Sequence, residues 1–167
     1  GTCNYILSKM TSDGSTFQEV LEEAQKKGYA EADPSFDIDG VDAAHKLTIL
    51  SAIAFEQKIT FSSLSISGIR HVSDIDINYA GKLGFCLKLL GIAKRNSTAE
   101  ITMALIPSEE QLASVNGALN AVSFRGTPVE TSISIGPGAG AGPTSSAVLA
   151  DLIDVATGLG NFAYGCP

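Results

Sequence analysis

Apolar residues recur at two spacings along the chain, and the change of spacing separates a helical first half from a strand-rich second half. In the first half, apolar positions three or four apart predict helices over the ranges 4–10, 16–28, 40–55 and 73–84. Thr2 is expected to cap the first of these helices. Thr16 and Glu19 have the spacing of a capping box, which predicts the start of the second helix.

Strand-like apolar runs follow, separated by Gly, Pro, Ser and Asn. They are "FCLKLLGIAKR", "AEITMALIPS", "GALNAVSFRG" and "TPVETSISIG". A glycine-rich stretch, "GPGAGAGPT", then leads to a last helix predicted over 145–157. Helices first, consecutive strands next and one closing helix indicate a single α+β domain over 1–167, with a mixed, largely antiparallel sheet covered by helices.

Composition and charge narrow the class of protein. Of the 167 residues 44% are hydrophobic and 17% charged, which is typical of a globular domain, and the net charge of −7 argues against nucleic acid or an anionic membrane as partner. No apolar run approaches the roughly 20 residues of a membrane span. Three cysteines without a CxxC pair favour a reduced, cytoplasmic protein without zinc. Because the chain begins inside a predicted helix, we expect it to be a piece of a longer polypeptide.

The stretch "GYAEADPSFDIDGVDAAHK" crowds acidic residues just before a helix. Placing Gly40 at position six of a calcium loop would put Lys46 at position twelve, where a bidentate Glu is needed, so calcium binding is not expected. The stretch closes on that lysine, and its carboxylates are Glu31, Asp33, Asp37, Asp39 and Asp42.

Two interpretations of this acidic stretch remain open. In the first, Asp39 caps the helix and Asp42 forms an ordinary surface ion pair with Lys46 one turn later, worth a few tenths of a kcal/mol. In the second, the carboxylates hold the ammonium of an amino-acid ligand. A lysine in such a place can then transfer protons, provided that partial burial lowers its pKa. His45 points to another face of the helix and is expected to pack or to face solvent.

The glycine-rich stretch has the strand–turn–helix order with which a dinucleotide fingerprint begins. Only about ten residues follow the helix, too few for a second strand and its acidic residue, so it is no complete Rossmann unit. Its glycines could let backbone approach a phosphate or a nicotinamide, or could simply make a tight connection.

Several of these stretches together closely resemble the substrate-binding and catalytic region of the homoserine dehydrogenase family. They are "GTCNYILSKM", "GYAEADPSFDIDGVDAAHKLTIL", "KLLGIAKR", "LASVNGALNAV" and "GPGAGAGPTSSAVLADLIDVA", in matching order over nearly the whole chain. The resemblance implies NAD- or NADP-dependent interconversion of L-homoserine and L-aspartate 4-semialdehyde, on the route to threonine, methionine and isoleucine. It also implies a homodimer, and an N-terminal Rossmann domain that precedes this region.

The same resemblance assigns roles within the acidic stretch. It makes Lys46 the catalytic lysine, which handles the proton on the oxygen of the carbon that exchanges hydride. Asp42 and Asp37 hold the substrate and that lysine in place. No metal ligand is implied in this region. A non-catalytic amino-acid-binding module that has kept the fold is the alternative.

The remaining residues that the resemblance singles out are expected to contact the ligands. Glu31 and Tyr29 would contact the amino acid, Glu31 through the ligand's ammonium. Gly1 and Thr2 would lie against substrate and cofactor, and Gly140 would approach the nicotinamide cofactor.

Overall fold

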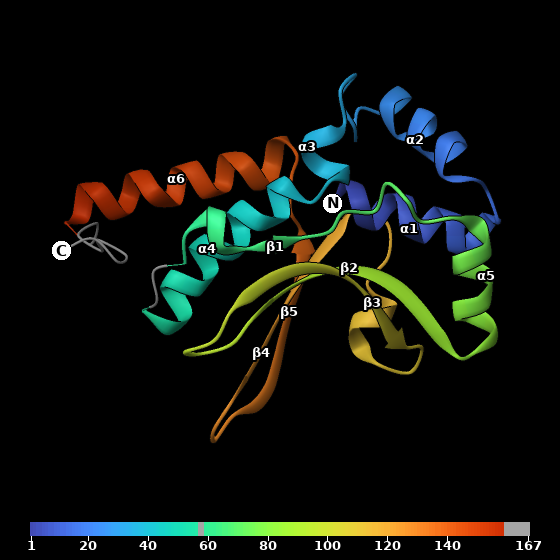
Figure 1. Cartoon of the computed structure of the whole chain (residues 1–167). Coiled ribbons are helices and arrows are strands. Elements are labelled where there is room, and N and C mark those ends of the chain that lie inside the picture. Colours follow the sequence, from blue (N-terminus) through green and yellow to red (C-terminus); the bar gives the residue numbers. More distant parts are fainter. Residues whose placement is uncertain (57–58, 159–167) are drawn as a thin grey trace.

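A computed structural model describes residues 1–56 and 59–158. Strand β3 is central in a three-stranded sheet, parallel to β1 and antiparallel to β2, and β4 and β5 form a separate antiparallel hairpin (Figure 1). The strands are β1 Ser65–Ile66, β2 Phe85–Ala93, β3 Ala99–Pro107, β4 Leu119–Gly126 and β5 Glu130–Pro137. The helices are α1 Thr2–Asp13, α2 Phe17–Lys26, α3 Ser35–Ile38, α4 Val41–Phe55, α5 Asp74–Lys82 and α6 Ala141–Thr157. The α+β prediction is confirmed, with the antiparallel strands divided between two sheets.

Helix α1 is the centre of the larger hydrophobic core. It buries Ile6, Leu7 and Met10 almost completely against α2, α5 and β2. A second core joins α4 to β3. Leu89 on β2 packs against both cores, so the sheet connects them.

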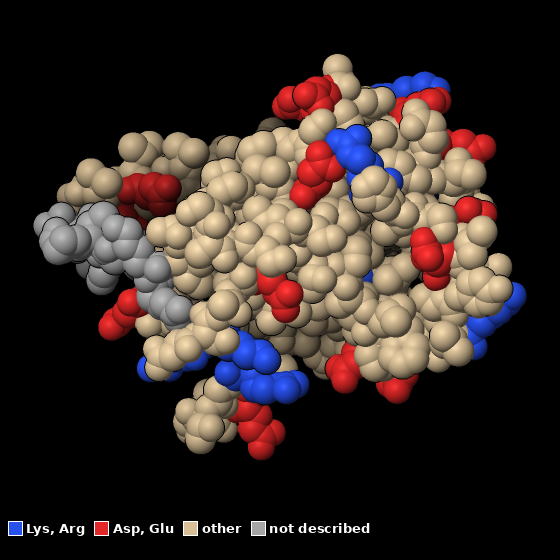
Figure 2. Space-filling view, in the orientation of Figure 1, with Lys and Arg blue, Asp and Glu red and all other residues tan. Residues whose placement is uncertain are grey.

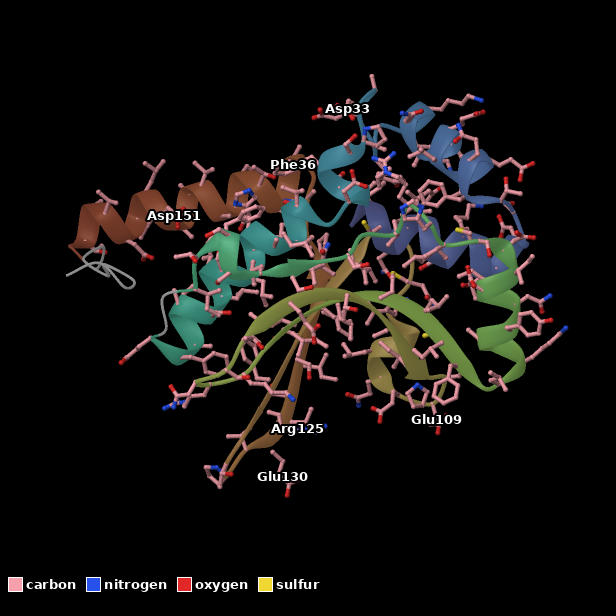
Figure 3. The ribbon with its side chains drawn as sticks, in the orientation of Figure 1. Asp33, Phe36, Glu109, Arg125, Glu130 and Asp151 are labelled. Carbon is pink, nitrogen blue, oxygen red and sulfur yellow. The ribbon has the colours of Figure 1, made fainter. Side chains whose placement is uncertain are left out.

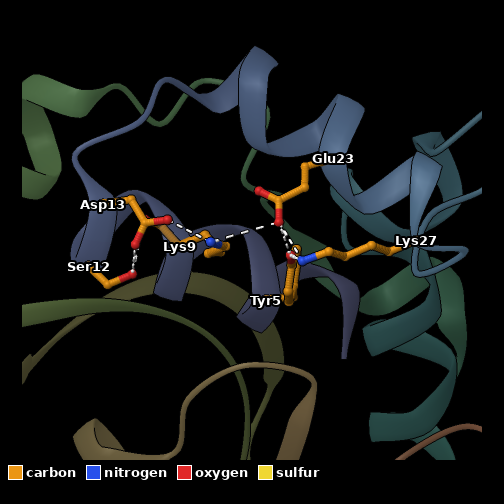
Figure 4. A network of polar contacts seen from close by, with 6 residues as sticks. All are labelled: Tyr5, Lys9, Ser12, Asp13, Glu23 and Lys27. Carbon is orange, nitrogen blue, oxygen red and sulfur yellow. Dashed lines mark hydrogen bonds and ion pairs between the residues drawn. The ribbon is translucent and has the colours of Figure 1, made fainter.

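A polar network joins α1 to α2 and the residue that follows it (Figure 4). The Tyr5 hydroxyl donates to Glu23 Oε1 at 2.9 Å, and Lys27 contacts both groups. The Lys27 ammonium and then the Tyr5 hydroxyl hold the pKa of Glu23 below its usual value. At the start of α2, Thr16 and Glu19 form the predicted capping box.

Two predicted caps are wrong. Thr2 is the first residue of α1 rather than its cap, because its hydroxyl contacts groups from other elements. Asp39 does not cap α4, because its carboxylate binds Arg70; Gly40 stands at the cap with a φ of 84°. A Cβ on Gly40 would lie 3.1 Å from a methyl group of Ile101, so glycine suits both the backbone and the space.

Several predicted boundaries also differ. Helix α1 is longer than predicted at both ends, and α6 begins at Ala141, inside the glycine-rich stretch. The short elements α3 and β1 were not predicted, since neither is long enough to show a periodicity. The exposed faces of α4 and α6 carry large apolar side chains. Arg125 and Glu130 lie near the far end of the β4–β5 hairpin (Figure 3). None of the helices in the described part of the chain is long and apolar enough to cross a membrane.

The chain after β1 touches the backbone at the end of α3. A Cβ on Gly68 would lie 2.1 Å from the Ile38 carbonyl oxygen and 2.4 Å from Asp39 Cα. The next amide, of Ile69, donates to that same carbonyl at 2.7 Å. This approach holds the α3–α4 corner in place.

We expect Gly68→Ala to lower the free energy of unfolding by about 1–3 kcal/mol or more, because backbone must move to admit the methyl group. Denaturant unfolding of the chain would measure this. Gly81→Ala in α5 is the control, since no atom beyond its chain neighbours and its own helix backbone lies within 4 Å of its Cβ position. It should be neutral or stabilise by about 0.5–1 kcal/mol. Equal effects of the two substitutions would contradict the close approach.

Candidate functional site

A pocket of about 160 Å³ lies where the first turn of α1 meets α3, α4, β2 and the segment 112–121. Five of the eight residues singled out from the sequence line it: Gly1, Thr2, Asp37, Asp42 and Lys46. These come from three helices and from the residue that precedes α1.

Lys46 and Asp42 form an ion pair one helical turn apart in α4. The distance from Lys46 Nζ to Asp42 Oδ2 is 2.8 Å, and the two side chains are 53% and 35% exposed. At this exposure the pair contributes at most a few tenths of a kcal/mol to stability. An ammonium has three protons, and this contact uses one of them.

Thr2 connects the first turn of α1 to the acidic stretch. Its hydroxyl oxygen lies 2.7 Å from Asp37 Oδ2 and 2.9 Å from the Tyr29 carbonyl oxygen, so its single proton can serve either acceptor. The Cys3 thiol donates to the backbone carbonyl of Asp37 at 3.1 Å. Residues at the start of α1 therefore hold Asp37 at the pocket. Burial raises the pKa of the Cys3 thiol to about 12.

Two carboxylates of the acidic stretch serve the local structure instead. Asp39 receives two hydrogen bonds from the Arg70 guanidinium, both at 2.8 Å, and this contact lowers the pKa of Asp39. Asp33 accepts from the hydroxyl and amide of Ser35, and these bonds lower the pKa of Asp33. Neither residue lines the pocket. Acidic side chains on the face shown in Figure 2 are spread out rather than gathered in one patch.

Three residues that the family resemblance singled out lie outside the pocket lining. The Tyr29 ring packs on Tyr5 with centroids 4.9 Å apart and reaches the site only through its backbone carbonyl. Glu31 is exposed, and its carbonyl accepts from Gln25 Nε2. Gly140 precedes α6 with a φ of 119°, a conformation that favours glycine.

His45 lies next to Lys46 but away from the pocket, as its position on the helix predicts. Its ring stacks between Phe36 and Phe61, with centroid distances of 5.8 and 4.7 Å. Within residues 1–56 and 59–158, no three His, Cys, Asp or Glu side chains stand together as a metal site.

Sequence reasoning missed Asn4, Lys88 and Asn120, which also line the pocket. Lys88 is buried, and that burial lowers its pKa. One signal was present: a lysine in the middle of the apolar run "FCLKLLGIA" needs a polar partner inside the fold. Asn4 and Asn120 carried no such signal, because Asn4 lies at a helix start and Asn120 in a half-exposed strand, where a polar side chain is ordinary.

Comparison with known proteins identifies the family of the chain. The family model for homoserine dehydrogenase matches residues 1–153. The chain belongs to the homoserine dehydrogenase family. Homoserine dehydrogenases of Pseudomonas aeruginosa and Synechocystis are 49% and 48% identical to it, each over 93% of the chain.

Solved homoserine dehydrogenase structures share the fold. The enzyme of Thiobacillus denitrificans superposes with a TM-score of 0.89 at 51% identity, over 93% of this chain and 37% of that one. A hyperthermophilic archaeal homoserine dehydrogenase mutant in complex with NADPH gives a TM-score of 0.78 at 29% identity, over 98% of this chain and 46% of that one. The chain spans 36% and 37% of the lengths of the Pseudomonas and Synechocystis relatives.

The raised pKa of Cys3 predicts slow alkylation of this thiol in the native protein. Only the thiolate reacts, and moving the pKa from 9.0 to about 12 reduces its fraction at pH 8 roughly a thousandfold. Between pH 9.0 and about pH 12, Cys3 is protonated in the native state and ionised in the unfolded state. The native state therefore binds more protons, and Cys3 makes the free energy of unfolding fall as pH rises through this range. Mass spectrometry after iodoacetamide treatment, native against guanidinium-unfolded chain, measures the difference. Equal rates in the two states would contradict the burial of this thiol.

Proposed function

We propose that this chain is the substrate-binding and catalytic region of an enzyme that interconverts L-homoserine and L-aspartate 4-semialdehyde with NAD or NADP. The observation that carries the proposal is the meeting of the Lys46–Asp42 pair, Asp37 and the first turn of α1 at one pocket. An amino acid with a reactive oxygen needs such a set of groups: carboxylates for the ammonium, a lysine for the oxygen and a helix start for the carboxylate.

The proposed chemistry assigns the proton to Lys46. Oxidation of homoserine removes a hydride and a proton from the CH–OH group. The nicotinamide supplies the hydride acceptor when it is bound. Lys46 takes the hydroxyl proton as a neutral amine, and in the reverse direction its ammonium returns a proton to the aldehyde oxygen. Asp42 holds the lysine at 2.8 Å and so limits the rotamers in which it can reach the substrate.

The proposal for the other residues follows from their places around the pocket. The free amides at the start of α1, by Gly1 and Thr2, would receive the substrate carboxylate, since a helix start favours anions. Asp37 would contact the substrate from α3, and Glu31 and Tyr29 would close over its ammonium from the 28–34 segment. Reaching the pocket from their present positions requires that segment to move when the ligand binds.

The relatives are longer than this chain, and we propose that a nucleotide-binding domain outside these 167 residues holds most of the cofactor. Gly140 would then approach the nicotinamide from the turn before α6. The isolated chain should be inactive for this reason. We further propose that the intact protein is a homodimer; exposed apolar residues on the β4–β5 hairpin, such as Phe124 and Ile135, support this, and light scattering of the intact protein would test it.

We expect Lys46→Ala in the intact polypeptide to lower kcat for homoserine-dependent reduction of NAD or NADP by about a hundredfold or more, because it removes the proton acceptor. Glu31→Ala should mainly raise KM for homoserine. The exposed Lys82 on α5 provides the control, since Lys82→Ala removes the same charge far from the pocket.

Three outcomes separate the interpretations. Full activity in Lys46→Ala would move the proton chemistry elsewhere and leave this lysine as a surface ion-pair partner. Equal effects of Lys46→Ala and Glu31→Ala on KM alone would contradict their division of roles. A folded intact protein that binds homoserine but reduces neither cofactor would favour a non-catalytic amino-acid-binding module.

A further inference from the structure

Lys88 is the one charged side chain that is buried within the described ranges 1–56 and 59–158. Among the residues that the structure describes, its ammonium contacts three neutral oxygens and no carboxylate. The acceptors are Asn4 Oδ1 at 2.9 Å, Asn116 Oδ1 at 3.2 Å and the Val115 carbonyl oxygen. Buried charges are costly and are normally paired with an opposite charge. A lysine kept in such a place therefore needs an explanation beyond stability.

All three partners of Lys88 belong to one arrangement around the segment 115–119, which joins the short 3-10 helix at 111–114 to β4. Asn4 Nδ2 donates to the carbonyl oxygens of Val115 and Leu119, both at 3.0 Å. The Val115 carbonyl thus accepts from Lys88 and Asn4 together, which uses both of its lone pairs.

A second turn of α1 extends the same arrangement. The amide of Gly117 donates to Ser8 Oγ at 3.2 Å, and Ser8 lies one turn after Asn4. The amide of Val115 closes the 3-10 helix on the Leu112 carbonyl at 3.3 Å, and residues 116–118 then belong to no helix or strand. Polar contacts from α1 and from Lys88 on β2 therefore help to fix their position.

Segment 115–119 leads directly into a wall of the pocket. Val115, Leu119, Asn120 and Ala121 line that pocket together with the Lys46–Asp42 pair. The Asn120 amide also fills the space beside Gly138, where a Cβ would lie 2.1 Å from Asn120 Nδ2. A shift of segment 115–119 would therefore change the shape of the pocket and disturb the turn before α6.

We propose that Lys88 is a positioning residue that holds segment 115–119, and with it the Val115–Ala121 wall, in the shape that binds the amino-acid substrate. This inference rests on the proposed function of the pocket. Lys88 acts through the Val115 carbonyl and Asn4, and all three of its protons are engaged there rather than on the substrate. Burial strengthens these hydrogen bonds because water does not compete for them.

The test is Lys88→Met in the intact polypeptide, since Met keeps the length of the side chain and removes the donors. Lys94→Met is the matched control, because Lys94 follows the same strand and is exposed outside the pocket. We expect KM for homoserine to rise about tenfold or more in Lys88→Met and to stay within about twofold in Lys94→Met. A purely structural role would instead lower kcat in proportion to the folded fraction and leave KM unchanged, which would overturn the proposal.

A second measurement does not depend on activity. Hydrogen exchange followed by mass spectrometry on a peptide spanning 113–121 should be faster in Lys88→Met than in wild type, while a peptide from α5 should not change. Unchanged exchange at 113–121 would overturn the proposal. Should wild type lack homoserine-dependent activity, the proposed function fails, and the exchange experiment still decides whether Lys88 holds the segment.

Asn4→Leu supplies an independent variant if Lys88→Met does not fold. It removes the hydrogen bonds to Val115 and Leu119 while leaving β2 intact, and it should raise both KM and the exchange rate at 113–121. Where both single variants fold, the double variant should raise KM for homoserine by less than the product of the two single increases, because both substitutions disrupt one network. Additive effects would show that Lys88 and Asn4 act separately, contrary to the proposal.

Discussion

Burial of helix α1 is the packing interaction on which the rest of the domain depends. Ile6, Leu7 and Met10 are almost completely shielded from water, and each such side chain contributes roughly 1.5–3 kcal/mol on burial. The apolar residues of α1 fix the helix against α2, α5 and β2. Its first turn is therefore fixed as well, which places Thr2 against Asp37 and Asn4 against the segment before β4. One helix in this way positions both the acidic side of the pocket and the wall beside it.

Two lysines line the pocket, and they differ in exposure and in the groups that they contact. Lys46 is half exposed and paired with a carboxylate, so its ammonium is solvated and can turn toward a ligand. Lys88 is buried among neutral oxygens, and that burial lowers its pKa. The first environment leaves the side chain free to reach a ligand, as the role proposed for Lys46 requires. The second suits a group that must hold backbone in one place.

The acidic stretch is divided between local structure and the pocket. Asp33 and Asp39 stabilise the short helix α3 and its contact with Arg70, whereas Asp37 and Asp42 face the pocket. This division depends on the close approach at Gly68, because the α3–α4 corner must lie against the chain after β1 for Asp39 to meet Arg70. The carboxylates that crowd this stretch of sequence thus belong to two groups, one that stabilises local structure and one that lines the pocket.

The sequence by itself determined the types of the longer elements and the pairing of Asp42 with Lys46. Helical spacing, the Thr16–Glu19 capping box and the alternating strand runs are local properties, so they could be identified without knowledge of the fold. Asp42 and Lys46 could be paired because both lie on one helix. Only the tertiary structure places Lys88 and Asn120 at the pocket. Both are distant in sequence from that helix and reach the pocket through packing of β2 and β4 around α1. The cap at Gly40 was decided in the same way, because Arg70, 31 positions further along the chain, competes for the Asp39 carboxylate that would otherwise cap the helix.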